Sequence, residues 1–417
     1  MSKRIILSLF FGIFFSLIIT FLFFKQFLYP TILPVVHDGN LRVFADWTVI
    51  VSANNCFEKG YDVFLENPCD FADRKHVYGS LLLYIPFIKM FPNFFYIYLP
   101  FILGILFLIS VSYLLHDTNL KRYWPSFLIL IFSIPVLLVI ERTNIDLIIF
   151  IFLLLLCLSK NFYLISSLIV ISSLSKFYPI LLSLIFIFEK DFKKTIIKIL
   201  TVTSIILIIL IFQWDSLVKI FENKSQFSGL GLHMFSFRGI IDFLNHFKIT
   251  IGNFDLNFIK YLYLLFFIIV PIFFLNYKYQ KQISLIFNNI EIYRNPNFEV
   301  KMFFLSSSLI LFCFFLIPNF VYREIYILGL IPLIISMNIK NKNNFCTFFY
   351  SLIVIKFLVT TITTFMFQSS IMPFLNSFLI LLKHTVDIYL ISIIFHVYIY
   401  FIKYSLKKIT NQVPQNV

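Results

Sequence analysis

Residues 124–158 read WPSFLILIFSIPVLLVIERTNIDLIIFIFLLLLCL, and a single polar break, residues 141–146, interrupts this otherwise apolar run. As one helix the stretch would be about 52 Å long, whereas the hydrocarbon core of a bilayer is about 30 Å thick. The chain must therefore turn at the break. The returning run, residues 147–158, covers only about 18 Å, so residues 144–146 must lie below the membrane surface. Polar side chains at that depth are costly unless protein buries them or water reaches them, so the break is a candidate functional site.

The next segment repeats this shape. An apolar run over 162–175 ends at Lys176-Phe177-Tyr178-Pro179, and a second run over 180–188 returns to the polar residues that follow. A purely structural interpretation is also open, in which Glu141, Arg142 and Asp146 pair with one another and Lys176 snorkels to the surface. Intramembrane ionisable residues favour the functional interpretation.

The composition excludes a water-soluble protein. Of 417 residues, 60% are hydrophobic and 13% are charged, whereas soluble domains carry about a quarter charged residues. The apolar runs are continuous and do not alternate with polar residues, which excludes a transmembrane β-barrel and leaves an all-α membrane protein. The runs predict about twelve spans, at 5–24, 94–115, 124–140, 147–158, 162–175, 177–188, 195–214, 259–276, 302–317, 325–338, 345–366 and 385–402.

Charge predicts the orientation. Lys3 and Arg4 precede the first run, which lacks a cleavage site, so we expect an uncleaved helix with a cytoplasmic N-terminus. Alternation then places the C-terminus and 18 of the 34 Lys and Arg in the cytoplasm, with 5 of the 20 Asp and Glu. This topology accounts for the net charge of +14 without nucleic acid as a partner. The prediction is a multi-pass protein of the plasma (inner) membrane whose two long loops, 25–93 and 215–258, lie outside.

The first of these loops holds a predicted surface helix, residues 46–59, which Gly60 ends. Cys56 and Cys69 share the loop, and a disulfide and two free thiols remain equally open. No Cys or His spacing indicates a metal site, and nothing indicates a cofactor. In the second half of the chain, Lys356 lies in mid-span and is expected to face the helix bundle.

Four motifs occur in order over about residues 40–190. They are Asp46 ahead of Gly60-Tyr61-Asp62-Val63-Phe64, then Asn67-Pro68-Cys69-Asp70 with Arg74 and Tyr78, then Glu141-Arg142-Thr143-Asn144-Ile145-Asp146, then Lys176-Phe177-Tyr178-Pro179. With these motifs the chain resembles glycosyltransferase family 87, a branch of the GT-C superfamily of membrane enzymes that use polyprenyl-phosphate sugars. The family pattern has Gly where Thr143 stands and often Tyr where Phe64 stands.

The resemblance implies a GT-C-like bundle with loop helices on the outer face. It divides the chain into a catalytic half, 1–190, which includes the first outer loop, and a variable transmembrane half, 191–417, which includes the second. The implied activity is inverting transfer of a hexose, with mannose the expected sugar, from a polyprenyl-phosphate donor to a lipid or glycan acceptor. Asp46 matches the general base, with Asp38 in reserve. The expected substrate-binding residues are Arg142, Asn144, Asp146, Lys176 and Arg323.

The chemistry supports these assignments, because a phosphate leaves without a proton. Inverting transfer therefore needs one carboxylate to deprotonate the acceptor and cations to hold the phosphate. Lys176, which has no acidic neighbour in sequence, is the expected phosphate ligand. Two rival functions stay open. A secondary transporter or flippase would predict inverted repeats with helices broken at mid-bilayer. A polysaccharide polymerase or ligase would share the apolar bulk and the large outer loop.

Overall fold

The computed structural model describes residues 3–24, 43–88, 90–116, 120–189, 191–223, 235–237, 239–241, 250–251, 254–255, 297–316, 321–341, 344–367 and 373–410. These residues are helical apart from loops and one short antiparallel pair, β1 (Thr250–Ile251) and β2 (Phe254–Asp255), in which Thr250 lies opposite Asp255. They group into two compact units. The first unit draws on residues 1–120, 136–186 and 193–229, and the second on residues 121–135, 187–192 and 230–417.

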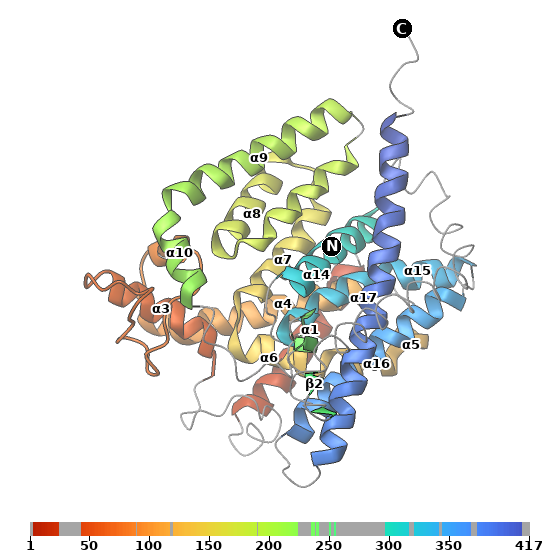
Figure 1. The fold of residues 1–417 in the computed structure, drawn as a ribbon, viewed down its shortest axis with the longest axis horizontal. Helices are drawn as coiled ribbons and strands as arrows, with labels where there is room; N and C mark the ends of the chain where they lie inside the picture. The colour runs from red at the N-terminus through yellow and green to blue at the C-terminus, as the bar shows by residue number, and fades with distance from the viewer. Residues whose placement is uncertain are drawn as a thin grey trace. The chain divides into compact units, whose positions relative to one another are not determined.

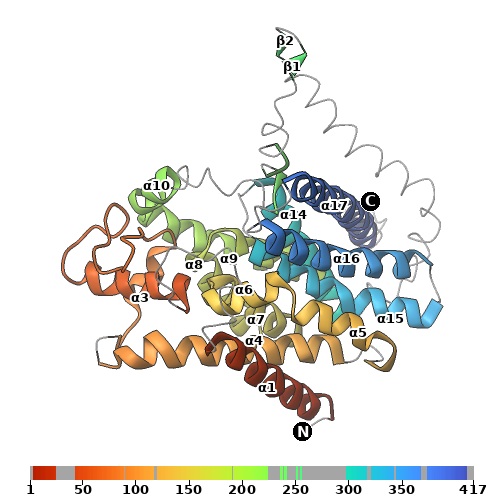
Figure 2. The same cartoon turned by 90° about the horizontal axis from the view of Figure 1, so that it is seen from below.

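The first unit contains the predicted hairpins and the first long loop. α1 packs against α4, which it crosses at an angle in Figure 2, and α4 packs in turn against α7 (Figures 1 and 2). Its elements are α1 (Lys3–Phe24), α3 (Ala45–Phe57), η2 (Ser80–Tyr84), η3 (Phe94–Tyr98), α4 (Leu99–His116), α6 (Ile134–Arg142), α7 (Ile145–Leu158), α8 (Phe162–Ser175), η4 (Tyr178–Phe188), α9 (Phe192–Phe212) and α10 (Trp214–Asn223).

The second unit is built on the helices of the C-terminal part. Here α16 packs along α17, and α14 packs against both η7 and α17. Its elements are α5 (Leu120–Ile131), α14 (Phe298–Leu316), η7 (Val321–Leu330), α15 (Ile331–Asn341), α16 (Asn344–Phe367) and α17 (Pro373–Thr410).

Seven helical segments are long and apolar enough to cross a membrane: Phe94–Leu115, Pro125–Arg142, Phe192–Phe212, Phe298–Leu316, Val321–Ile339, Asn344–Thr364 and Phe378–Lys403. Four shorter apolar helices lie at further predicted spans: Ile5–Ile18, Ile145–Leu158, Phe162–Ser175 and Tyr178–Phe188. The predicted span at 259–276 lies outside the described residues. The helical membrane architecture is therefore confirmed in its coarse form. The number twelve and the GT-C-like arrangement remain predictions.

The turn predicted at residues 141–146 is confirmed, because α6 ends at Arg142 and α7 begins at Ile145. Asn144 caps α7, and its side-chain oxygen accepts a hydrogen bond from the backbone N–H of Asp146 at 3.1 Å. Thr143 has a φ of 45°, a left-handed conformation that a β-branched residue adopts only at a cost and that glycine adopts freely. The glycine of the family pattern thus falls where the backbone favours one.

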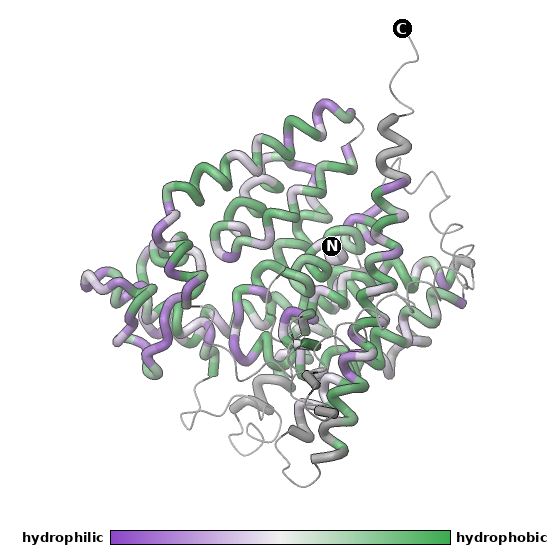
Figure 3. The backbone as a smooth tube through the Cα atoms, in the orientation of Figure 1, coloured by the Kyte–Doolittle hydropathy of each residue, from purple (hydrophilic) through white to green (hydrophobic). Residues whose placement is uncertain are grey.

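The first loop folds around α3. The helix ends close to the predicted point, and Gly60 has a φ of 90° just beyond it. Cys56 and Cys69 form a disulfide, which decides between the two alternatives left open by the sequence. Cys56 belongs to a small apolar core that includes Val63 and, from α10, Ile220. Figure 3 shows polar residues gathered around this loop, whereas the long helices are mostly apolar.

The loop meets the end of α8 backbone to backbone at Gly79. The N–H of Gly79 donates to the carbonyl of Ser175 at 3.0 Å, and a side chain at residue 79 would collide with the carbonyl of Leu174. Only glycine permits so close an approach. The contact brings Tyr78 of the loop to Lys176, the residue that follows α8.

Candidate functional site

The structure brings Asp46 to the turn between α6 and α7. Arg142 Nη1 lies 3.0 Å from one carboxylate oxygen of Asp46, and Asn144 Nδ2 lies 2.5 Å from the other. Asp46 comes from the first turn of α3, and its partners are 96 and 98 residues further along the chain. Both oxygens of the carboxylate are therefore held in position by donors from the turn between α6 and α7.

Lys176 joins the same corner from the end of α8. Its ammonium nitrogen lies 2.6 Å from Asp146 Oδ2 and 2.6 Å from Asn144 Oδ1. Asn144 therefore links Asp46 to Lys176. Its amide nitrogen contacts Asp46, while its oxygen contacts Lys176 and the start of α7. Together these residues form the Asp46 cluster: Asp46, Arg142, Asn144, Asp146 and Lys176.

The side chains of the Asp46 cluster differ in solvent exposure. The side chains of Arg142 and Asp46 are 25% and 14% exposed, whereas those of Lys176 and Asp146 are 9% and 0% exposed. Lys176 does not snorkel to the surface but lies in a buried ion pair. Asp46 is the more accessible of the two carboxylates.

Two tyrosines complete the cluster without having been assigned a role from the sequence. The hydroxyl of Tyr178 bonds the second carboxylate oxygen of Asp146. The hydroxyl of Tyr78 lies 3.4 Å from Asn144 Nδ2, and its ring centroid lies 5.4 Å from the Lys176 ammonium, a cation–π contact. Both tyrosines belong to the family motifs, and this position in the sequence could have identified them as part of the site.

A carboxylate such as Asp46 can accept a proton from a hydroxyl, and the two cations of the cluster, Arg142 beside Asp46 and Lys176 beside Asp146, can stabilise an anion. Within the part of the chain that the structure describes, no group of His, Cys, Asp and Glu could hold a metal ion. The two remaining sequence-predicted residues are Arg323 and Asp38. Arg323 is half-buried in η7 of the second unit, and Asp38 falls outside the described residues.

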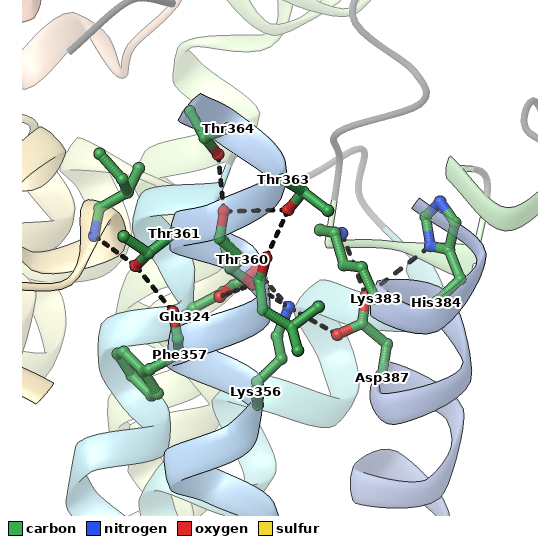
Figure 4. Close-up of polar contacts among 12 residues, drawn as sticks. Glu324, Lys356, Phe357, Thr360, Thr361, Thr363, Thr364, Lys383, His384 and Asp387 are labelled. Carbon is green, nitrogen blue, oxygen red and sulfur yellow. Dashed lines mark hydrogen bonds and ion pairs between the residues drawn. The ribbon is translucent and has the colours of Figure 1, made fainter. Parts of the chain in front are cut away.

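A second set of ionisable side chains lies inside the second unit (Figure 4). Lys356 of α16 contacts Glu324 Oε1 at 2.8 Å, Asp387 Oδ1 at 2.6 Å and Thr360 Oγ1 at 2.7 Å. Asp387 also contacts Lys383 at 3.1 Å through its other oxygen. These residues, together with His384, 3.7 Å from Asp387, are named the buried charge cluster.

The buried charge cluster joins three elements, η7, α16 and α17. Its two carboxylates face two lysines, so with a neutral His384 the formal charges cancel. The sequence placed Lys356 correctly toward the bundle but did not identify its partners, Glu324 and Asp387. The predicted last span began at residue 385 and therefore left out Lys383. The pair of Lys383 and Asp387 could have been predicted from the sequence, because their i, i+4 spacing puts them on one face of a helix.

No protein-family model matches this chain. A search of curated proteins finds no match either. The resemblance to glycosyltransferase family 87 therefore rests on the motifs, and the functional argument rests on the geometry of the Asp46 cluster.

The first loop should be acid-sensitive because of His76. Its ring is fully buried between Phe64 and Tyr78, and burial lowers its pKa from 6.5 to about 4. The neutral ring therefore stabilises the loop above pH 6.5, and this stability, about 3 kcal/mol, should be lost as the pH falls toward 4. Hydrogen exchange of the loop over this pH range should detect the loss.

His76→Phe should keep the ring packing and remove this acid-dependent loss. The variant also loses the contact of His76 with the Gly79 carbonyl, so it should start about 1 kcal/mol less stable at neutral pH. Equal pH profiles for the two proteins would contradict the assignment.

Asp387 should be essential to the stability of the second unit. Asp387→Leu leaves two lysines sharing one carboxylate in an apolar interior, and the expected loss is about 3 to 5 kcal/mol. The double variant Lys383→Met with Asp387→Leu restores the charge balance and should recover much of this loss. Thermal unfolding in detergent measures both, with Leu381→Ala, an exposed site on α17, as control. Equal losses in the single and double variants would refute the charge-balance explanation.

Proposed function

We propose that the protein is a membrane glycosyltransferase. It transfers a hexose, with mannose the favoured sugar, from a polyprenyl-phosphate donor to a lipid or glycan acceptor on the outer face of the plasma (inner) membrane, with inversion. The observation that carries the proposal is the Asp46 carboxylate, held on both oxygens by Arg142 and Asn144 and placed beside the Lys176–Asp146 pair.

In the proposed reaction, Asp46 accepts the proton of the acceptor hydroxyl. The acceptor oxygen attacks the anomeric carbon from the side opposite the phosphate, and the bond from that carbon to the phosphate oxygen breaks with its electron pair on the phosphate. Arg142 and Lys176 supply positive charge as the anion forms, while Asp146, to which Tyr178 donates a hydrogen bond, holds Lys176 in place. The donor's apolar tail would lie among the helices.

The motifs assign the catalytic role to residues 1–190 and leave acceptor choice to residues 191–417. Arg323 is a second candidate ligand for the donor phosphate. In this topology both termini are cytoplasmic, and the partners are the donor lipid, the acceptor and the membrane.

Replacing the proposed base should abolish turnover. Asp46→Asn keeps the shape of the side chain and removes the proton acceptor, so transfer from a labelled polyprenyl-phosphate hexose by isolated membranes should fall about 10²- to 10⁴-fold. Glu66→Gln, an exposed carboxylate of the same loop, should transfer normally and serves as the matched control. Wild-type transfer by Asp46→Asn at normal expression would exclude Asp46 as the base.

Three variants separate a phosphate ligand from a structural ion pair at Lys176. Lys176→Ala should raise the donor concentration needed for half-maximal rate, and Lys176→Arg should be partly tolerated because a positive charge is kept. Lys176→Ala also strands the buried Asp146, so Lys176→Ala with Asp146→Ala is the informative case. If Lys176 binds phosphate, the double variant stays impaired although its unpaired charge is gone. Full recovery of donor use would show a structural role only.

The buried charge cluster favours transport as a second candidate function, because ionisable residues inside the membrane often mark ion or substrate pathways. Reconstituted vesicles distinguish the two functions. A transporter should move a polyprenyl-linked or free sugar across the vesicle membrane without forming a new glycosidic bond. A glycosyltransferase should form that bond, and a polymerase or ligase would extend or transfer a longer glycan.

A further inference from the structure

The segment between η2 and α4, residues 84–98, presents a row of apolar side chains outward. Exposure ranges from 41% at Phe94 to 68% at Met90. The outward side chains are Tyr84, Phe87, Met90, Phe91, Phe94, Ile97 and Tyr98. Lys89 is the only charged residue of the segment. So large an apolar surface on a fixed segment indicates a partner.

The opposite side of the segment is firmly attached to α3. Trp47 Nε1 donates to the carbonyl of Phe95 at 2.8 Å, and Asn55 Nδ2 contacts the hydroxyl of Tyr96 at 3.3 Å. Ile88 and Phe95 point inward and are buried. The apolar side chains are therefore held outward by a defined conformation.

The backbone itself contributes to this orientation. Phe87 has a φ of 66°, a left-handed conformation that a bulky side chain adopts only at a cost. The resulting turn leaves the Phe87 ring 63% exposed, whereas the next residue, Ile88, is buried.

We infer that residues 84–98 dock on the lipid bilayer, with their outward side chains among the lipids of the leaflet next to the first loop. Lipid is the partner because the segment is continuous with a candidate membrane span. Residues 94–98 of the segment already belong to Phe94–Leu115, which is long and apolar enough to cross a membrane. Aromatic residues gather at the two interfaces of membrane proteins, and five of the seven outward side chains are Phe or Tyr.

Docking would fix the depth of the Asp46 cluster. Trp47 bonds this segment, and Asp46 precedes Trp47 on α3. A segment anchored at the lipid interface would hold the Asp46 carboxylate at a constant depth relative to the acyl chains, near the head group of a lipid-linked substrate. The inference itself does not depend on sugar transfer.

Spin-label accessibility in the full chain tests the inference. Phe87→Cys and Phe91→Cys are labelled separately in lipid nanodiscs, and Leu65→Cys is the matched control because Leu65 is a similarly exposed apolar residue in a polar part of the same loop. The native cysteines form the disulfide or are buried, and the unmodified chain gives the background label. The readout compares relaxation by oxygen, which concentrates in lipid, with relaxation by a water-soluble nickel chelate.

Labels at 87 and 91 should show a several-fold higher ratio of oxygen to nickel accessibility than the label at 65. A ratio equal to that at 65 would place the segment in water and overturn the inference. Shielding from both reagents, with broadening between labels, would show that a second copy of the chain covers the segment, and would overturn it equally. Sugar-transfer activity does not enter the measurement, so a failed sugar-transfer proposal would leave its result readable.

Discussion

A charge inside an apolar helix bundle needs its counter-charge within reach, and this requirement organises both halves of the protein. Asp146 is fully buried and lies 2.6 Å from Lys176, and Lys356 is fully buried between Glu324 and Asp387. Breaking such pairs is expensive because the remaining ion loses both water and partner. Each cluster therefore ties together segments that are distant in the sequence. The two clusters differ in access, since only the first has a carboxylate near the surface.

This difference suggests different roles. In the Asp46 cluster, Asn144 links a buried ion pair to a more accessible one, so the inner pair can support the geometry of the outer carboxylate. The loop reaches this corner through Gly79, whose lack of a side chain allows backbone contact with α8. The site thus combines a rigid interior with an open edge. Proposed chemistry at Asp46 requires both properties.

Span length and the polar break predicted the hairpin turn, and Gly60 predicted the end of α3; both signals can be read locally. The grouping of Asp46 with residues 142, 144, 146 and 176 was implied by the family resemblance. The ion-pair partner of each buried charge could not be predicted from such local features. Lys176 had no acidic neighbour in sequence, yet Asp146, 30 residues earlier, lies beside it. Lys383 and Asp387 were missed because hydropathy cannot recognise a charged pair that neutralises itself within a span.

The pairing in the second unit also bears on how the chain enters the membrane during synthesis. A single Lys or Asp at the centre of a helix costs about 2.5 to 3.5 kcal/mol to insert. Glu324 arrives first, and Lys356 can neutralise it once α16 has followed. α17 then brings Lys383 and Asp387 together, one turn apart. Once α16 is in place, and again once α17 is in place, the paired charges cancel, so the ribosome need not finish the chain before the earlier helices settle.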